Sequence, residues 1–119
     1  MTNAVYTRAL SELSTIFGAL SNLESGTGAR AKAAKKGKLT IYHRNIATGN
    51  QAEIAFDVAS LAGRLKVSEA ETLTFLSQLK AATGRPVKLD PQYQWPRVGL
   101  ATDEHVTGVI AALKQRIPG

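Results

Sequence analysis

The stretch LAGRLKVSEAETLTFLSQL, residues 61–79, decides the fold that this sequence predicts. Asp57 stands where it can cap a first short helix, and Ser68 stands where it can cap a second one. Glu71 follows Ser68 by three residues, which is the capping-box pattern of a helix start. The apolar stripe of the second helix is formed by Thr72, Leu76 and Leu79. The sequence therefore predicts two short helices joined by a tight turn.

The residues around this stretch predict strands and a last helix. Residues 39–46 are rich in β-branched and aromatic side chains, and residues 51–56 alternate between apolar and polar. The turn residues Ala-Thr-Gly-Asn lie between them, so the two segments predict a β-hairpin. Residues 86–89 and 97–101 are two short extended pieces. A final helix is predicted over Asp103–Ile117, capped by Thr102.

The N-terminal part has a different pattern. From Asn3 to Leu23, apolar residues recur in steps of three and four, which predicts one amphipathic helix. Residues 25–38 are mostly Gly, Ser, Thr, Ala and Lys, which predicts a flexible basic linker. We therefore expect an amphipathic helix in 1–24, a linker in 25–38 and a compact domain in 39–119. The helix is a candidate dimerisation element.

Residues 57–101 resemble the winged helix-turn-helix superfamily. The Leu-Ala pair, the later Leu and the hydrophobic-Ser turn of that family match Leu61, Ala62, Leu65, Val67 and Ser68. The resemblance implies an α+β, mostly helical fold. In this fold a winged-helix-like core with a β-hairpin follows the amphipathic N-terminal helix, and residues 86–89 and 97–101 form the wing.

Two positions depart from the family pattern. Lys66 occupies the turn position where many members have Gly, and Glu69 and Glu71 open the second helix. A helix that reads bases usually presents Arg, Lys, Asn or Gln at its start, and carboxylates there repel phosphates. The resemblance therefore indicates a fold more strongly than it indicates base readout.

The positive charge is concentrated in one segment. The chain has 15 Lys and Arg against 9 Asp and Glu, a formal net charge of +6. Residues 25–44 contain six of these cations and no acidic residue. Such a segment attracts polyanions, although a solvated linker that only keeps the protein in solution has the same composition. Apart from Tyr42, the segment lacks the aromatic anchors typical of a membrane-surface sequence.

We expect a small basic nucleic-acid-binding protein. Duplex DNA is the expected partner, held by a homodimer that acts as a transcriptional regulator or as a plasmid or phage accessory factor. The candidate contact residues are Arg30, Lys32, Lys35, Lys36, Lys38, Arg44, Arg64, Lys66, Ser68, Thr72, Lys80, Arg85, Lys88 and Arg97.

Two alternatives stay open. A basic arm together with Tyr93 and Trp95 would also suit RNA or a single strand. The other class is a protein-interaction module, an adaptor or inhibitor encoded by a mobile element. Its docking surfaces would be the N-terminal helix and helix 69–82.

The sequence offers little for catalysis. The absence of cysteine excludes disulfides, thiolate metal sites and a cysteine nucleophile. His43 and His105 lack metal-site spacing, and no glycine-rich phosphate loop or nucleophile-elbow motif occurs. We expect no enzymatic activity, no metal and no cofactor. With no long apolar run and no signal-peptide pattern, a soluble, cytoplasmic protein without membrane contact is expected.

Overall fold

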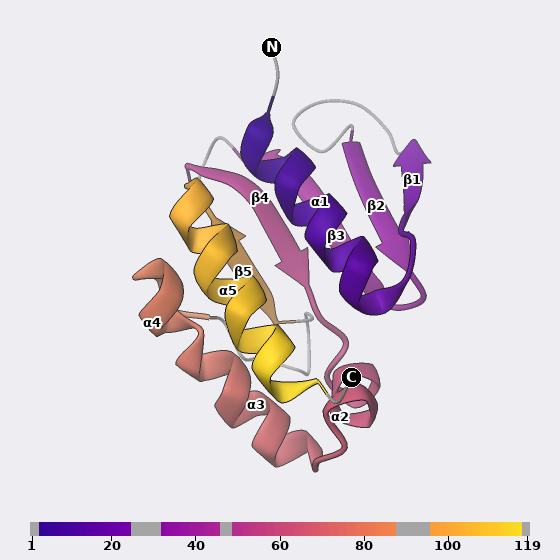
Figure 1. Cartoon of the computed structure of the whole chain (residues 1–119), viewed down its shortest axis with the longest axis vertical. Coiled ribbons are helices and arrows are strands. Elements are labelled where there is room, and N and C mark those ends of the chain that lie inside the picture. The colour runs from indigo at the N-terminus through magenta and orange to yellow at the C-terminus, as the bar shows by residue number, and fades with distance from the viewer. Residues whose placement is uncertain (1–2, 25–31, 46–48, 88–95, 118–119) are drawn as a thin grey trace.

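The computed structural model describes residues 3–24, 32–45, 49–87 and 96–117, and their fold is α+β, as predicted (Figure 1). The elements are α1 (Ala4–Phe17), β1 (Ser21–Glu24), β2 (Lys32–Lys36), β3 (Leu39–Asn45), β4 (Asn50–Ala55), α2 (Val58–Leu65), α3 (Glu69–Gln78), α4 (Lys80–Thr83), β5 (Arg97–Leu100) and α5 (Asp103–Arg116). Among the described residues no helix has the length and apolar character needed to cross a membrane.

The strands form one antiparallel sheet in the order β1-β2-β3-β4-β5. The predicted hairpin is confirmed as β3 and β4, with Ile41 opposite Ile54. Helices α1 and α5 lie side by side across one face of this sheet (Figure 1). The core between the layers includes Leu13 of α1, Leu113 of α5 and the two isoleucines, all fully buried.

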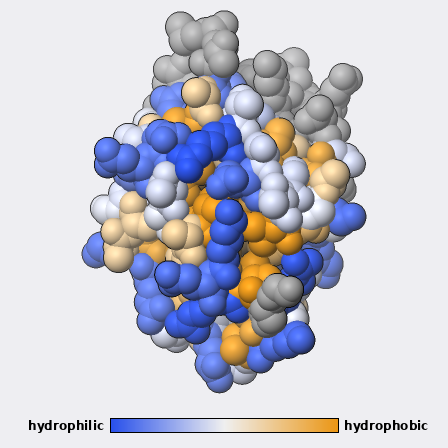
Figure 2. Space-filling model, in the orientation of Figure 1, coloured by the Kyte–Doolittle hydropathy of each residue, from blue (hydrophilic) through white to orange (hydrophobic). Residues whose placement is uncertain are grey.

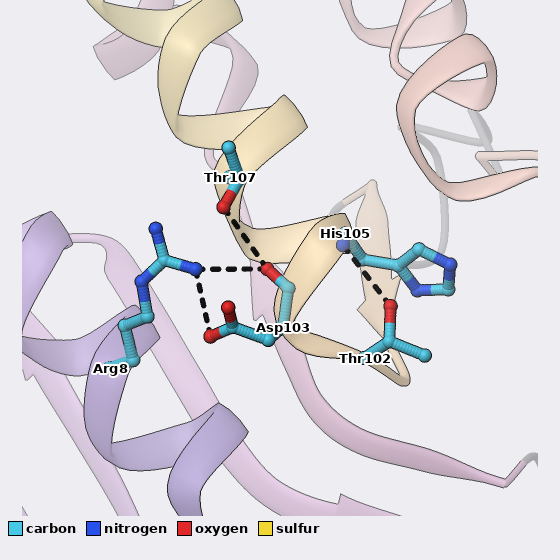
Figure 3. Close-up of polar contacts among 5 residues, drawn as sticks. All are labelled: Arg8, Thr102, Asp103, His105 and Thr107. Carbon is cyan, nitrogen blue, oxygen red and sulfur yellow. Dashed lines mark hydrogen bonds and ion pairs between the residues drawn. The ribbon is translucent and has the colours of Figure 1, made fainter.

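The seam between α1 and α5 has an apolar interior and a polar end. Figure 2 shows apolar surface in the middle of this face, bordered by hydrophilic side chains. At the polar end Arg8 Nη1 contacts both the carbonyl oxygen of Asp103 (2.9 Å) and its carboxylate Oδ1 (2.8 Å), as Figure 3 shows. Thr102 accepts a hydrogen bond from the backbone N–H of His105 (3.2 Å), which confirms it as the N-cap of α5. One arginine thus ties α1 to the capped first turn of α5.

The predicted helix pair is confirmed as α2 and α3. Asp57 caps α2 and Ser68 caps α3, each through its side-chain oxygen. Helices α2 and α3 contact each other, and the short α4 packs against α5. The predicted stripe of α3 is buried: Thr72, Leu76 and Leu79 are each at most 2% exposed.

The N-terminal helix is shorter than the periodicity predicts. It ends at Phe17, and residues 21–24, expected to be helical, form β1. The physical reason is Gly18, whose φ of +99° cannot continue a helix and is readily adopted only by glycine. The apolar residues after Gly18 keep the helical spacing by coincidence.

The prediction of a flexible linker over 25–38 is wrong for Lys32–Lys36, which form β2 between β1 and β3. Ala34 of β2 is fully buried opposite Ile41. Residues 25–31 lie outside the described residues. The basic segment is therefore built into the sheet from Lys32 onward.

The expected wing differs as well. Strand β5 confirms an extended segment near 97–101, but it pairs with β4 at the edge of the sheet. Residues 86 and 87 are not in a strand, and residues 88–89 lie outside the described part of the chain. The strand expected to form a wing is thus a member of the main sheet, because its register aligns Val98 with Ile54 in the core.

Candidate functional site

The structure brings three of the predicted contact residues together around one pocket of about 390 Å³. Lys36, Lys38 and Arg64 line it with the polar residues Asp57 and Ser60. Gly37 and the apolar residues Phe17, Leu39, Phe56 and Leu61 complete its lining. We call this site the basic pocket. The end of α1, the β2–β3 turn and the start of α2 meet there, at the lower right of Figure 1.

The two lysines are positioned by the β2–β3 hairpin. Lys36 pairs with Leu39, so that Gly37 and Lys38 form a two-residue turn. Both lysines are exposed. Lys36 also extends toward the end of α1, where a Cβ placed on Gly18 would lie 3.4 Å from its Cε. The two-residue turn therefore places two positive charges at the pocket.

Arg64 approaches the same pocket from α2. Its Nη2 donates to the carbonyl oxygen of Ile16 at 2.8 Å, in the last turn of α1. Its guanidinium lies 5.2 Å from the centre of the Phe17 ring. Arg64 thus satisfies a helix-end carbonyl, which has no partner within its own helix, and fixes α2 against α1. The guanidinium is a structural tie as well as a pocket cation.

Asp57 places one negative charge among the cations. Its Oδ2 accepts from the backbone N–H of Ser60 at 2.9 Å and so caps α2. Desolvation raises the pKa of this carboxyl, but hydrogen bonds from Ser60 and the charge of Lys38 outweigh it, and the pKa lies below its ordinary value. Asp57 is therefore ionised at neutral pH.

Not every predicted contact residue can serve as one. Thr72 is completely buried, and its hydroxyl donates to the carbonyl of Ser68 at 2.9 Å. The prediction of Thr72 as a nucleic-acid contact is therefore wrong, because the position belongs to the core stripe of α3. Ser68 is exposed, but its side chain is engaged as the cap that accepts from Glu71 N at 3.1 Å. Lys66 and Lys80 are exposed.

Two more predicted cations lie in contacts of their own. Arg97 places its guanidinium 4.7 Å from the centre of the Tyr42 ring. Arg85 Nη1 donates to Asn50 Oδ1, and Asn50 Nδ2 donates to the buried carboxylate of Glu53 at 3.3 Å. These contacts stabilise the fold around β3, β4 and β5. Neither arginine lines the basic pocket.

The side chains of the remaining predicted contact residues are not described. Arg30 and Lys88 lie outside the described residues, as do Tyr93 and Trp95. For Lys32, Lys35 and Arg44 only the strand positions of the backbone are described. The sequence offered no sign of the apolar lining, because Phe17, Leu39 and Phe56 come from three separate elements. The signal that was available is the local pattern Lys-Lys-Gly-Lys at 35–38, which is typical of a charged tight turn.

The two histidines have structural partners. His43 Nε2 lies 3.4 Å from Asn3 Nδ2, and its ring packs edge-on against Tyr6, with 5.0 Å between the ring centres. His105 Nδ1 accepts from the backbone N–H of Ala101 at 3.0 Å. Within the part of the chain that the structure describes, no group of three His, Asp or Glu side chains is arranged to hold a metal ion.

Comparison of this chain with family models, with curated proteins and with solved structures found no match.

Proposed function

We propose that this chain binds nucleic acid through the phosphate backbone, with the basic pocket at the centre of the interface. The observation that carries the proposal is the convergence of Lys36, Lys38 and Arg64 from separate parts of the chain. Cations gathered on one site displace the counterions of a polyanion, and this supplies much of the affinity of such complexes. The net charge of +6 favours the same partner.

We also propose that α2 and α3 are the helix pair of a winged-helix-like core. Lys66, between them, adopts a left-handed conformation with φ +59°. This conformation suits glycine best, and glycine is what many family members have at the matching turn position. No comparable observation supports a wing, because β5 belongs to the main sheet.

In this proposal α3 contributes little to base readout. Glu69 and Glu71 are exposed in its first turn and would repel phosphates. A homodimer stays part of the proposal, but it needs a surface other than the apolar face of α1. Tyr6, Ala9 and Leu13 bury that face within the chain.

Salt-dependent binding to a fluorescent random-sequence duplex tests the proposal. Anisotropy titrations between about 50 and 300 mM salt give the slope of log affinity against log salt, which changes by roughly 0.9 for each phosphate contact. The double variant Lys36→Ala, Lys38→Ala should bind every duplex more weakly and flatten the slope by about 1.8.

The matched control is Lys114→Ala, Arg116→Ala, which removes the same charge from exposed positions on α5 that are not among the predicted contact residues. We expect the control to keep most of the slope. A slope unchanged in the pocket variant but flattened in the control would place the interface on α5 instead. If the unaltered protein binds no duplex or single strand at the lowest salt, the proposal of nucleic-acid binding fails.

A second function is favoured by the surface of α3. Besides its two glutamates, its exposed positions carry small or neutral side chains: Ala70, Thr74, Ser77 and Gln78. This surface suits a protein partner better than a phosphate backbone. Glu69→Lys with Glu71→Lys should strengthen DNA binding if α3 faces DNA, and should weaken binding of a protein partner if α3 is a docking surface.

A further inference from the structure

We propose that the basic pocket receives one unpaired base, so that this chain prefers a single-stranded nucleic acid to a duplex. The inference rests on the proposed function and names the form of nucleic acid that the same site takes. It departs from the duplex that a helix-turn-helix resemblance implies. Three observations carry it: the apolar interior of the pocket, the Phe17–Arg64 pair and the position of Asp57.

The interior of the pocket is more apolar than a phosphate site needs. Phe56, Leu39 and Leu61 are buried, and Phe17 is partly exposed beside them. A phosphate is held by hydrogen-bond donors and gains nothing from aromatic and aliphatic carbon. A nucleobase has flat apolar faces that benefit from such a lining. The volume of about 390 Å³ lies in the range of pockets that hold small organic molecules.

Phe17 and Arg64 form a stacking platform. The guanidinium lies 5.2 Å from the Phe17 ring centre. Its bond to the carbonyl of Ile16, at 2.8 Å, holds the guanidinium in place before any ligand arrives. Unpaired bases stack on aromatic rings and on arginine planes, with about 1–3 kcal/mol per stacked base. The platform therefore has both groups that recognise a base face.

Asp57 gives the ligand an orientation. Its ionised carboxylate repels a phosphate, whereas it can accept a hydrogen bond from the amino group of cytosine or adenine. Lys36 precedes the β2–β3 turn and extends toward Gly18 at the end of α1. Its positive charge attracts the phosphate. A nucleotide thus lies with its base toward Asp57 and its phosphate toward Lys36. A base inside a duplex is paired and stacked on both sides, so only an unpaired base can enter.

The test compares three fluorescent probes of about twelve nucleotides on the full chain: a mixed-sequence strand, its duplex, and a strand of the same length with abasic sugars at every position. The abasic strand keeps every phosphate and has no base that could enter the pocket. We expect the intact strand to bind about 5- to 150-fold more tightly than either other probe, from the stacking range given above.

Two variants locate the effect. Phe17→Leu keeps an apolar side chain but removes the ring, and should abolish the preference for the intact strand. Tyr42→Leu is the matched control. It also removes an aromatic ring against which an arginine, Arg97, packs, but Tyr42 does not line the basic pocket. This control should keep the preference.

The failures of the two proposals are distinguishable. Equal binding of all three probes, with a steep salt dependence, overturns the base pocket and leaves backbone binding in place. Loss of the preference with Tyr42→Leu rather than Phe17→Leu also overturns it. Since the abasic probe is measured on the unaltered protein, the outcome does not depend on the folding of any variant. No binding of any probe at low salt removes both proposals.

Discussion

The contact of α5 with α4 predicts how Gly108 responds to substitution. Gly108 lies in the interior of α5, where alanine normally stabilises a helix by about 0.8–1.0 kcal/mol relative to glycine. In this fold a Cβ on Gly108 would lie 2.8 Å from the Cβ of Ala82 and 3.5 Å from its Cα. Carbon atoms of packed side chains prefer about 3.5–4.0 Å, so one helix has to move.

The expected free energies follow from these two effects. Inserting a methyl group into such a contact costs about 1–3 kcal/mol, from which the gain in helix propensity is subtracted. We therefore expect Gly108→Ala to lower the free energy of unfolding by about 1 kcal/mol. Combining it with Ala82→Gly moves the methyl group from α4 to α5 and relieves the contact. The double variant should show a favourable coupling of about 1–3 kcal/mol.

Urea denaturation of the four proteins, followed by circular dichroism, measures this cycle. An increase in stability of about 1 kcal/mol for Gly108→Ala, together with zero coupling, would refute the reasoning. Helix propensity would then act unopposed, and α4 could not lie as close to α5 as the structure has it.

Four other substitutions test three single positions. Lys66→Gly should raise the free energy of unfolding by about 0.5–1 kcal/mol in urea titrations, because φ +59° strains any residue with a Cβ; a loss of stability would contradict this account of the turn. Asp57→Ala should cost about 1 kcal/mol at neutral pH through the lost cap of α2, whereas Asp57→Asn keeps the cap. Because the folded state lowers the pKa of Asp57, the stabilisation by its charge is fully present above the ordinary aspartate pKa of 3.8 and is lost as the pH falls through the lower folded pKa. Melting measured across this acid range should therefore show a weaker decline in stability for Asp57→Asn than for the unaltered chain. Thr72→Val should lower the free energy of unfolding by about 1 kcal/mol, because the hydrogen bond to Ser68 is lost, and should leave the affinity for nucleic acid unchanged. Loss of binding without loss of folding would show that Thr72 does contact nucleic acid.

The parts of the fold that could be predicted depend on interactions between residues close together in the sequence. Asp57, Ser68 and Thr102 were identified as caps from their side chains and the residues that follow, and each accepts the expected backbone hydrogen bond. The β3–β4 hairpin was predicted from β-branched segments around a turn. In each case the interaction spans only a few residues, so the sequence contains all of its determinants.

The missed elements depend on distant partners. Lys32–Lys36 consists of alanine and lysine, which favour a helix over a strand. The segment is a strand because β1 and β3 pair with its two edges and the side chain of Ala34 is buried in the core. Leu20 and Leu23 continue the helical spacing beyond Gly18, so the pattern of apolar residues does not mark the end of α1. The positive φ of Gly18 ends α1, and β1 begins three residues later at Ser21.

The candidate site also combines features that could be predicted from the sequence with one that could not. Its charges could be predicted individually, since Lys36, Lys38 and Arg64 were all among the expected contacts. Their meeting around Phe17 and Phe56 could not, because it requires α1 to end beside the start of α2. Because the apolar periodicity places the end of α1 several residues too late, it gives no indication of this pocket.

The double role of Arg64 decides which substitutions can test the site. A guanidinium has five N–H donors, and the bond to Ile16 uses one of them, so donors remain for an anion. Replacing Arg64 would at once remove a pocket cation, remove the arginine half of the stacking platform and free the last turn of α1. Weaker binding after that substitution would not separate recognition from folding. Lys36 and Lys38 are exposed on a tight turn, so their loss should change the charge of the pocket and leave its walls in place. The salt slope of the lysine variant is therefore the measurement that reports on recognition alone.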